Sequence, residues 1–77
     1  MTREEAVKIV VSMLEKNVDG LEMSEDQMGK TLVDLGVDSL DVVLVIMDVS
    51  EAAGVTISDD EAELLDTPEK IVEFLVA

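Results

Sequence analysis

The sequence predicts an all-α fold: a small four-helix bundle of three main helices plus one short helix, with a long loop between the first and second helices. Two observations lead to this prediction. Helix-start patterns recur four times along the 77 residues, and apolar residues follow them at helical spacing. No Asn-Gly or Asp-Gly turn joins two alternating runs, so no β-hairpin is expected. A chain of this length holds one hydrophobic core, and we expect residues 1–77 to form a single domain.

The first helix is expected over about residues 3–16. Thr2 and Glu5 match a capping box, in which two side chains satisfy backbone N–H groups of the first turn. The stretch "NVDG" (17–20) predicts the end of the helix. The apolar residues at helical spacing are Ala6, Ile9, Val10, Met13 and Leu14.

A long loop is expected from Val18 to Val37, because glycines and polar residues are frequent there. Loops of this length are unusual in a compact domain unless they are held in place or functional. A short helical turn fits inside it. The side chains expected to hold the loop to the core are Leu21, Met28, Leu32 and Leu35.

The second helix is expected to begin at "DSLD" (38–41) and to run to about Ala53. Asp38 is a suitable cap, and Asp41 adds negative charge near the positive end of the helix dipole. Gly54 predicts the end. We interpret "VTI" (55–57) as an extended connector, since it has no partner strand.

Two further helices complete the bundle. "SDDE" (58–61) is a second capping box and opens a short helix to about Leu65. "TPEK" (67–70) starts the last helix, with Thr67 as cap and Pro68 at the first helical position, where its missing N–H costs nothing. The side chains expected to point inward from this helix are Ile71, Val72, Phe74 and Leu75.

The second helix has one polar stripe and is otherwise apolar. At about 100° per residue, one stripe holds Asp41, Leu44, Asp48, Glu51 and Ala52, and its three acids indicate that it faces solvent. The apolar residues on the other faces are Leu40, Val43 and Met47 on one side and Val42, Val45, Ile46 and Val49 on the other. A helix this apolar should be central and covered by all its neighbours. A second interpretation is that the helices of the bundle can separate on this side to take up an apolar ligand.

Several kinds of chemistry are excluded by composition. The chain has no Cys and no His, so it has no thiolate nucleophile, no zinc finger and no histidine general base. The stretch at 7–14 is too short and too interrupted by charge to span a bilayer. The N-terminus does not match a secretory signal. We therefore expect a cytoplasmic protein without membrane insertion, and a monomer.

Negative charge dominates the chain. Its 19 acids against 5 bases give a net charge of −14, which argues against nucleic acid and against anionic membranes as partners. Residues 31–69 contain no Lys or Arg, so we expect this half of the molecule to be uniformly negative and to dock on proteins with basic patches. The acids of this stretch are Asp34, Asp38, Asp41, Asp48, Glu51, Asp59, Asp60, Glu61, Glu63, Asp66 and Glu69.

Ser39 lies inside this negative stretch, in "DLGVDSLDVV" (34–43). One reading is that it only helps to start a helix. A catalytic nucleophile is excluded because no histidine is present to act as its base. The remaining reading is that Ser39 is the substrate of another enzyme, because a modification site has to be exposed and held in a defined geometry.

These residues resemble the phosphopantetheine-attachment segment of acyl carrier proteins. The similarity continues through the second helix, "VTISDDEAELL" (55–65) and "DTPEKIVEFL" (66–75), and covers nearly the whole chain. The resemblance implies a carrier rather than an enzyme. It implies that Ser39 carries 4′-phosphopantetheine, transferred from coenzyme A by a Mg²⁺-dependent phosphopantetheinyl transferase (a holo-acyl-carrier-protein synthase). Asp38, Leu40 and Asp41 match the motif around this serine.

The resemblance also implies where partners and acyl chains bind. Acyl groups would be held as thioesters and presented to fatty-acid, polyketide or related synthases, through acyl-transfer and condensing enzymes with basic docking patches. The docking residues implied on the second helix are Asp41, Leu44, Asp48 and Glu51. The residues implied to line an acyl pocket are Val43, Ile46, Met47 and Ile57. Leu44 departs from the family pattern, because fatty-acid-type carriers commonly have glutamate there, which implies a carrier dedicated to another pathway.

Alternatives remain at this stage. A peptidyl or aminoacyl carrier, including the D-alanyl kind, is usually less acidic and often has other residues beside the serine. An unmodified acidic helical interaction domain is the second alternative. A calcium-binding loop does not fit, because from Asp34 or Asp59 the sixth position is Ser39 or Leu64 rather than glycine. No metal site is expected.

Overall fold

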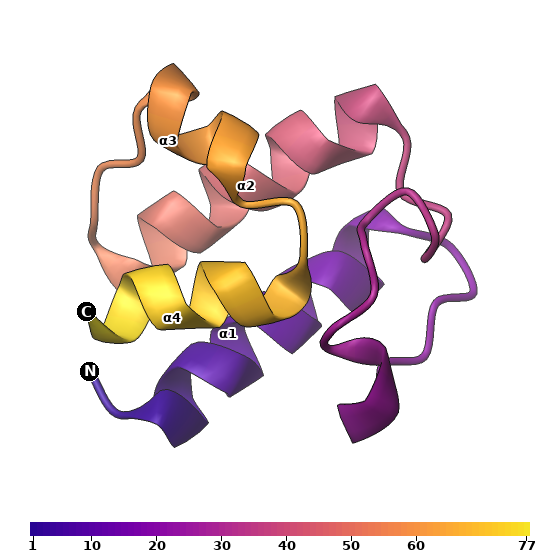
Figure 1. Cartoon of the computed structure of the whole chain (residues 1–77), viewed down its shortest axis with the longest axis horizontal. Helices are drawn as coiled ribbons and strands as arrows, with labels where there is room; N and C mark the ends of the chain where they lie inside the picture. The colour runs from indigo at the N-terminus through magenta and orange to yellow at the C-terminus, as the bar shows by residue number, and fades with distance from the viewer.

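The computed structural model describes residues 1–77 and contains four α-helices and one short 3₁₀ helix (Figure 1). The helices are α1 (Arg3–Asn17), α2 (Ser39–Ala53), α3 (Asp59–Leu64) and α4 (Pro68–Val76), and the 3₁₀ helix η1 is Glu25–Gln27. There is no strand, and residues 55–57 form the extended connector that was predicted. The all-α prediction is confirmed, with helix ends within about one residue of those expected.

Each helix begins where a side chain accepts a hydrogen bond from the backbone of the first turn. Thr2 and Ser58 form the predicted capping boxes of α1 and α3. Thr67 Oγ1 accepts the Lys70 N–H at 3.1 Å, with Pro68 at the start of α4. These bonds satisfy donors that a helix leaves without intrahelical partners.

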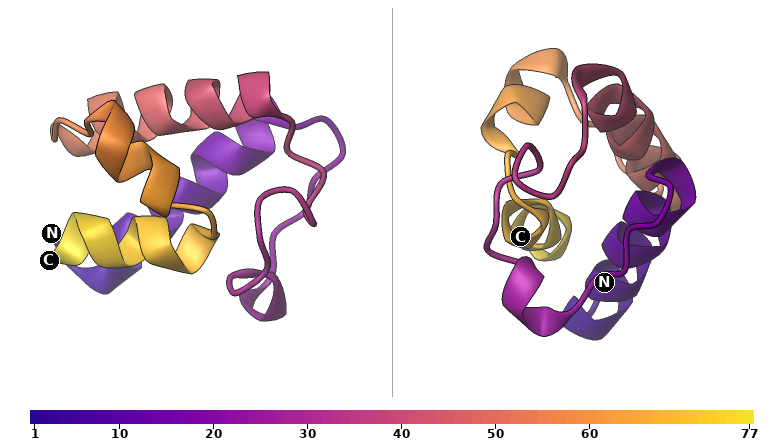
Figure 2. Two further views of the ribbon diagram at one scale, coloured as in Figure 1. Left: turned by 45° about the horizontal axis from the view of Figure 1, so that its top comes forward. Right: turned by 90° about the vertical axis from the view of Figure 1, so that its right-hand side faces the viewer.

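The long helix α1 packs against both α2 and α4, and it runs antiparallel to each of them (Figure 2). Side chains on its inner face, Val10 and Leu14, are fully buried. Phe74, expected to point inward, is only half-buried, so the innermost core is aliphatic. The buried core consists of Ala6, Val10, Leu14, Leu32, Val37, Val45, Ile46, Val49, Leu65, Ile71, Val72 and Leu75.

The long loop before α2 is held by backbone hydrogen bonds as well as by side chains. Its Leu32 N–H donates to the Asp66 carbonyl at 2.9 Å. The Met28 carbonyl accepts the Glu69 N–H, a donor of the first turn of α4, also at 2.9 Å. Both bonds attach the loop to the junction between α3 and α4, and so they position the start of α2.

Apolar side chains reinforce this attachment. Of the predicted anchors, Leu32 is buried, while Leu21, Met28 and Leu35 are half-buried against the core. Val37, at the end of the loop, is also buried, although it was not among the predicted anchors.

Helix α2 is not covered on all sides, and that prediction is wrong. Val45, Ile46 and Val49 are buried, but the face that begins at Leu40 is open to solvent. In so small a bundle α1 and the short α3 cannot enclose a 15-residue helix. The longest helices have 15 residues, and none combines the length and apolarity needed to cross a bilayer.

Candidate functional site

Ser39 is the first residue of α2, and it is exposed. The helix cap is made by the preceding residue, because Asp38 Oδ1 accepts the Asp41 N–H at 2.9 Å. Starting the helix therefore does not require the Ser39 hydroxyl. The Ser39 side chain belongs to the first turn of this helix and is exposed, so another molecule can reach it.

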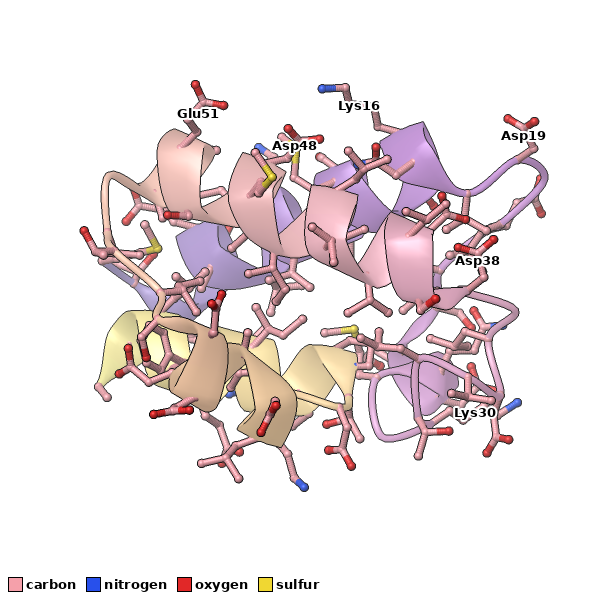
Figure 3. The ribbon with its side chains drawn as sticks, turned by 90° about the horizontal axis from the view of Figure 1, so that it is seen from above. Lys16, Asp19, Lys30, Asp38, Asp48 and Glu51 are labelled. Carbon is pink, nitrogen blue, oxygen red and sulfur yellow. The ribbon has the colours of Figure 1, made fainter.

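The surroundings of Ser39 combine two electrostatic effects. The first turn of a helix carries the positive end of the helix dipole, which favours an anionic group such as a phosphate. Asp38 and Asp41 add negative charge on either side of the serine, and neither of them has a cationic partner. Lys30, in the preceding loop, lies away from this end of α2 (Figure 3).

Asp48, predicted to face solvent as a docking residue, lies at the contact between α1 and α2 instead. Its Oδ2 accepts from Asn17 Nδ2 at 2.9 Å and from Lys16 Nζ at 3.3 Å. The Asn17 hydrogen bond, with a smaller contribution from Lys16, holds the pKa of the Asp48 carboxyl below its ordinary value. Only about a quarter of this side chain is exposed.

The expectation of a uniformly negative half is also corrected, because three cations pair with its acids. Lys16 reaches Asp48 from α1, Arg3 pairs with Glu69, and Lys70 Nζ lies 2.8 Å from Asp66. The Lys70 contact holds the pKa of Asp66 below its usual value. Three of the five cations thus pair with acids of residues 31–69, while the acids beside Ser39 stay unpaired.

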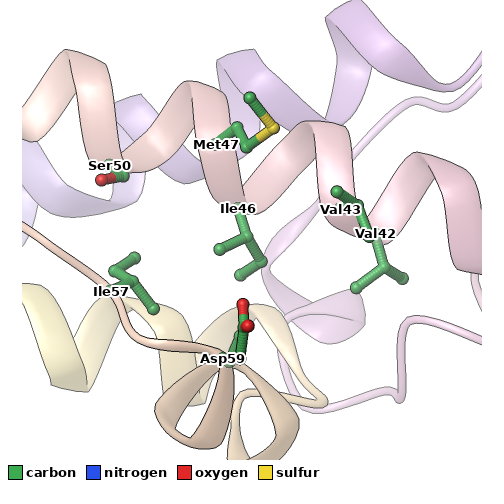
Figure 4. Close-up of a pocket in the computed structure, with 8 residues that line it drawn as sticks. Val42, Val43, Ile46, Met47, Ser50, Ile57 and Asp59 are labelled. Atoms are coloured by element: carbon green, nitrogen blue, oxygen red, sulfur yellow. The ribbon is translucent and has the colours of Figure 1, made fainter.

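A cleft of about 180 Å³ opens between α2 and α3. All four residues predicted to line an acyl pocket are found there: Val43, Ile46, Met47 and Ile57. The cleft has four further lining residues that were not predicted from the sequence: Val42, Ser50, Asp59 and Ala62. Figure 4 shows Asp59 extending from α3 towards Ile46 of α2.

The cleft lies close to Ser39 along the helix. Val42 and Val43 follow Ser39 by three and four residues, a spacing that places them one turn away on the same side of α2. A second cleft, of about 330 Å³, lies between loop residues 31–33 and α3, and it shares Val42 and Ala62 with the first. The apolar lining of the clefts therefore begins within one helical turn of the exposed Ser39 hydroxyl.

Polar groups in the first cleft are few. The Ser50 hydroxyl donates to the Val55 carbonyl, so its hydrogen is already used. Asp59 is exposed at the mouth. No group of three or more Asp and Glu side chains is placed to hold a metal ion.

Comparison with known proteins agrees with this geometry. Residues 7–75 match the family model described as "Phosphopantetheine attachment site". The acyl carrier protein of Exiguobacterium sibiricum is 36% identical over 76 residues, which is 97% of this chain and 95% of the relative. The acyl carrier proteins of Rubrobacter xylanophilus and a Sulfurovum species are each 38% identical, covering 99% and 94% of this chain and 94% and 91% of the relatives.

The chain belongs to the acyl carrier protein family. The prediction of a carrier rather than an enzyme is confirmed, and so is phosphopantetheine as its prosthetic group. The residues of the carrier fit that group. Ser39 offers an exposed hydroxyl at the positive end of α2, and an apolar cleft lies one turn away.

Proposed function

We propose that this carrier holds acyl groups as thioesters on a 4′-phosphopantetheine arm attached to Ser39. The observation that carries the proposal is the exposed Ser39 hydroxyl, which is left out of the helix cap and lies one turn from an apolar cleft. When bound, the arm supplies the thiol that a chain without cysteine lacks. The relatives named as acyl carrier proteins support the same assignment.

The neighbours of Ser39 have separate roles in this proposal. Asp38 fixes the start of α2 through its bond to the Asp41 N–H, and so it fixes the direction of the serine. Leu40 is exposed beside the serine and is available to the transferase that attaches the arm. Asp41 and Glu51 supply negative charge for basic docking patches on acyl-transfer and condensing enzymes of fatty-acid, polyketide or related synthases.

Attachment at Ser39 is tested by intact mass. The purified chain is incubated with coenzyme A, Mg²⁺ and a broad-specificity phosphopantetheinyl transferase, and we expect the mass to rise by one phosphopantetheine. Ser39→Ala should gain nothing. Ser12→Ala is the matched control, because Ser12 is an exposed serine on another helix, α1, and this variant should be modified like the original chain. A modified Ser39→Ala variant would show that another residue is the attachment site.

The cleft between α2 and α3 is proposed to shelter the acyl chain. An octanoyl group has about six more methylenes than an acetyl group, and each methylene removed from water contributes up to about 0.8 kcal/mol. The octanoyl carrier should therefore melt several degrees above the acetyl carrier. Ala62→Phe, which fills the cleft, should reduce this difference, whereas Ala52→Phe on the exposed side of α2 should preserve it. Equal melting temperatures for the two loaded forms would contradict sheltering.

The class of cargo is tested by loading the apo carrier with acyl-activating and aminoacyl-activating enzymes. We expect acyl loading to be faster. Preferential aminoacylation would assign the chain to the aminoacyl or D-alanyl carriers instead.

A further inference from the structure

One carboxylate lines the cleft between α2 and α3, which is otherwise mostly apolar. Six of the eight lining residues are hydrophobic, and Asp59 is the one charged residue among them. Asp59 and Ala62, three residues apart on the same side of α3, both line the cleft, whereas Asp60 does not. Figure 4 shows the Asp59 side chain directed across the cleft towards Ile46.

The Asp59 carboxylate has no partner within the chain. It takes part in no hydrogen bond or ion pair, and residues 31–69 contain no Lys or Arg that could reach it. The other polar residue that lines the cleft is Ser50, and its hydroxyl hydrogen is donated to the Val55 carbonyl. Both polar residues of the cleft can therefore accept a hydrogen bond from a ligand, but neither has a hydrogen left to donate.

The position of Asp59 determines which part of an acyl group it meets. An acyl chain in the cleft packs its apolar tail against residues such as Val43, Ile46 and Ile57. The carbons next to the thioester stay at the mouth, where Asp59 is exposed, because the arm reaches the cleft from Ser39 outside it.

The chemistry at this position distinguishes two kinds of acyl chain. A hydroxyl on carbon 3, counted from the thioester carbonyl, can donate to the Asp59 carboxylate, and hydrogen bonds to a charged group are stronger than neutral ones. A carbonyl on the same carbon offers only lone pairs. The carboxylate then loses water to the cargo without gaining a hydrogen bond.

We propose that Asp59 selects the cargo that the cleft shelters, and that acyl chains with a hydroxyl on carbon 3 are held better than chains with a carbonyl there. The inference rests on the proposed function, because it assumes an arm on Ser39 and an acyl chain in the cleft. It assigns Asp59 as a residue that determines specificity, and it names 3-hydroxyacyl groups as the favoured class of cargo.

The test compares carriers that bear different acyl groups on the same arm. The arm is transferred from the matching acyl-coenzyme A thioesters, and each product is checked by intact mass. We expect a 3-hydroxyoctanoyl carrier, in the better of its two enantiomers, to melt about 3 °C above the 3-oxooctanoyl carrier. A hydroxyl on carbon 7 should give no such gain over octanoyl, because it would enter the apolar part of the cleft.

Two neighbouring variants test the role of the carboxylate. In Asp59→Asn the amide both donates and accepts, so the difference between the two cargoes should fall below about 1 °C. Asp60→Asn is the matched control, since it removes the same charge from an exposed residue that lines neither cleft, and it should keep the difference. Each comparison is made between two loaded forms of one variant, so a change in the stability of α3 cancels.

A spectroscopic measurement tests the contact itself. The carboxyl carbons of the aspartates are followed by ¹³C NMR in the octanoyl, 3-hydroxyoctanoyl and 3-oxooctanoyl carriers. The Asp59 signal should move most with the 3-hydroxy cargo, because only that cargo donates to it, while the Asp60 signal should stay in place.

The outcomes separate the two proposals. A chain that never gains the arm, or whose octanoyl and acetyl forms melt alike, refutes the proposed function. A chain that shelters octanoyl but holds the 3-hydroxy and 3-oxo cargoes equally refutes the role of Asp59 alone. So does a preference that Asp59→Asn and Asp60→Asn change by the same amount.

Discussion

At the scale of single residues, one carboxylate connects the two longest helices. Asp48 of α2 accepts from Asn17 and Lys16, both in the last turn of α1. Asn17 also donates to the Met13 carbonyl at 2.8 Å, so its amide satisfies one of the last carbonyls of α1 as well. This small network keeps α1 against α2 at the edge of the core, and it holds the Asp48 carboxylate in contacts within the chain.

The network predicts a pH-dependent stability difference between the original chain and Asp48→Asn. The folded pKa of Asp48 is lowered, chiefly by the Asn17 hydrogen bond, so the carboxylate stabilises the fold at pH values above the unfolded pKa of about 4. This contribution is lost as pH falls through the folded pKa. We expect Asp48→Asn to melt a few degrees lower at pH 6 and to match the original chain near pH 3.

Glu22→Gln provides the control for the loss of one negative charge. Glu22 is exposed and takes part in no side-chain hydrogen bond or ion pair. Because the chain has a large excess of acids, its replacement should leave the melting temperature unchanged or raise it slightly. A fall at pH 6 equal to that of Asp48→Asn would mean that the network contributes nothing specific.

At the scale of elements, α2 has well-defined ends, and these ends fix the positions of Ser39 and of the cleft. Asp38 caps its start, and Gly54 ends it in the left-handed conformation with φ +69°. The chain then turns so that the Val55 N–H donates to the Ser50 carbonyl at 3.1 Å, and the Ser50 hydroxyl donates to the Val55 carbonyl. Ile57 and α3 follow directly, so the geometry of this turn sets the width of the cleft.

Replacing Gly54 should test this turn. A side chain in the left-handed region costs roughly 1–2 kcal/mol, and we expect Gly54→Ala to lower the free energy of unfolding by about 1 kcal/mol. Gly29→Ala is the control, because Gly29 has no positive φ and no atom within 4 Å of an added Cβ. Urea unfolding of both variants checks the prediction, and equal midpoints would contradict it.

At the scale of the whole molecule, a small core has to hold together a highly charged surface. The longest extent is 27 Å, and a net charge of −14 is spread over it. Three ion pairs offset only part of the repulsion between the acids, and each involves largely exposed cations. The twelve buried apolar residues therefore have to supply most of the stability.

Salt should stabilise the carrier for this reason. The Debye length is about 30 Å at 0.01 M salt, longer than the molecule, and about 10 Å at 0.1 M, so added salt screens repulsion between acids on different helices. We expect the melting temperature to rise by several degrees between these NaCl concentrations. A fall in the melting temperature would mean that the ion pairs contribute more than the repulsion between acids, because salt weakens both.

Much of this molecule was predictable from short stretches of sequence. The caps at Thr2, Asp38, Ser58 and Thr67 define the helix starts because each cap bonds a donor three residues away, within one turn. The position of Ser39 at the start of α2 follows from the same local rule. The family resemblance implied four residues for the acyl pocket, and they do line one cleft, because three of them lie within one turn on adjacent faces of α2 and the connector brings Ile57 alongside.

Only the tertiary structure decided which faces of α2 are covered and which acids are free. Helical periodicity gives the angular position of Leu40, Val43, Met47 and Asp48, but not the size or direction of the neighbouring helices. Because α3 is short and α1 approaches from the other side, the face of α2 that carries these three apolar residues stays open, and Asp48 is bound to Asn17 and Lys16, more than thirty residues away in the sequence. Helix ends depend on contacts within one turn, which the sequence specifies by itself, whereas burial and ion pairing depend on distant segments that only the fold brings together.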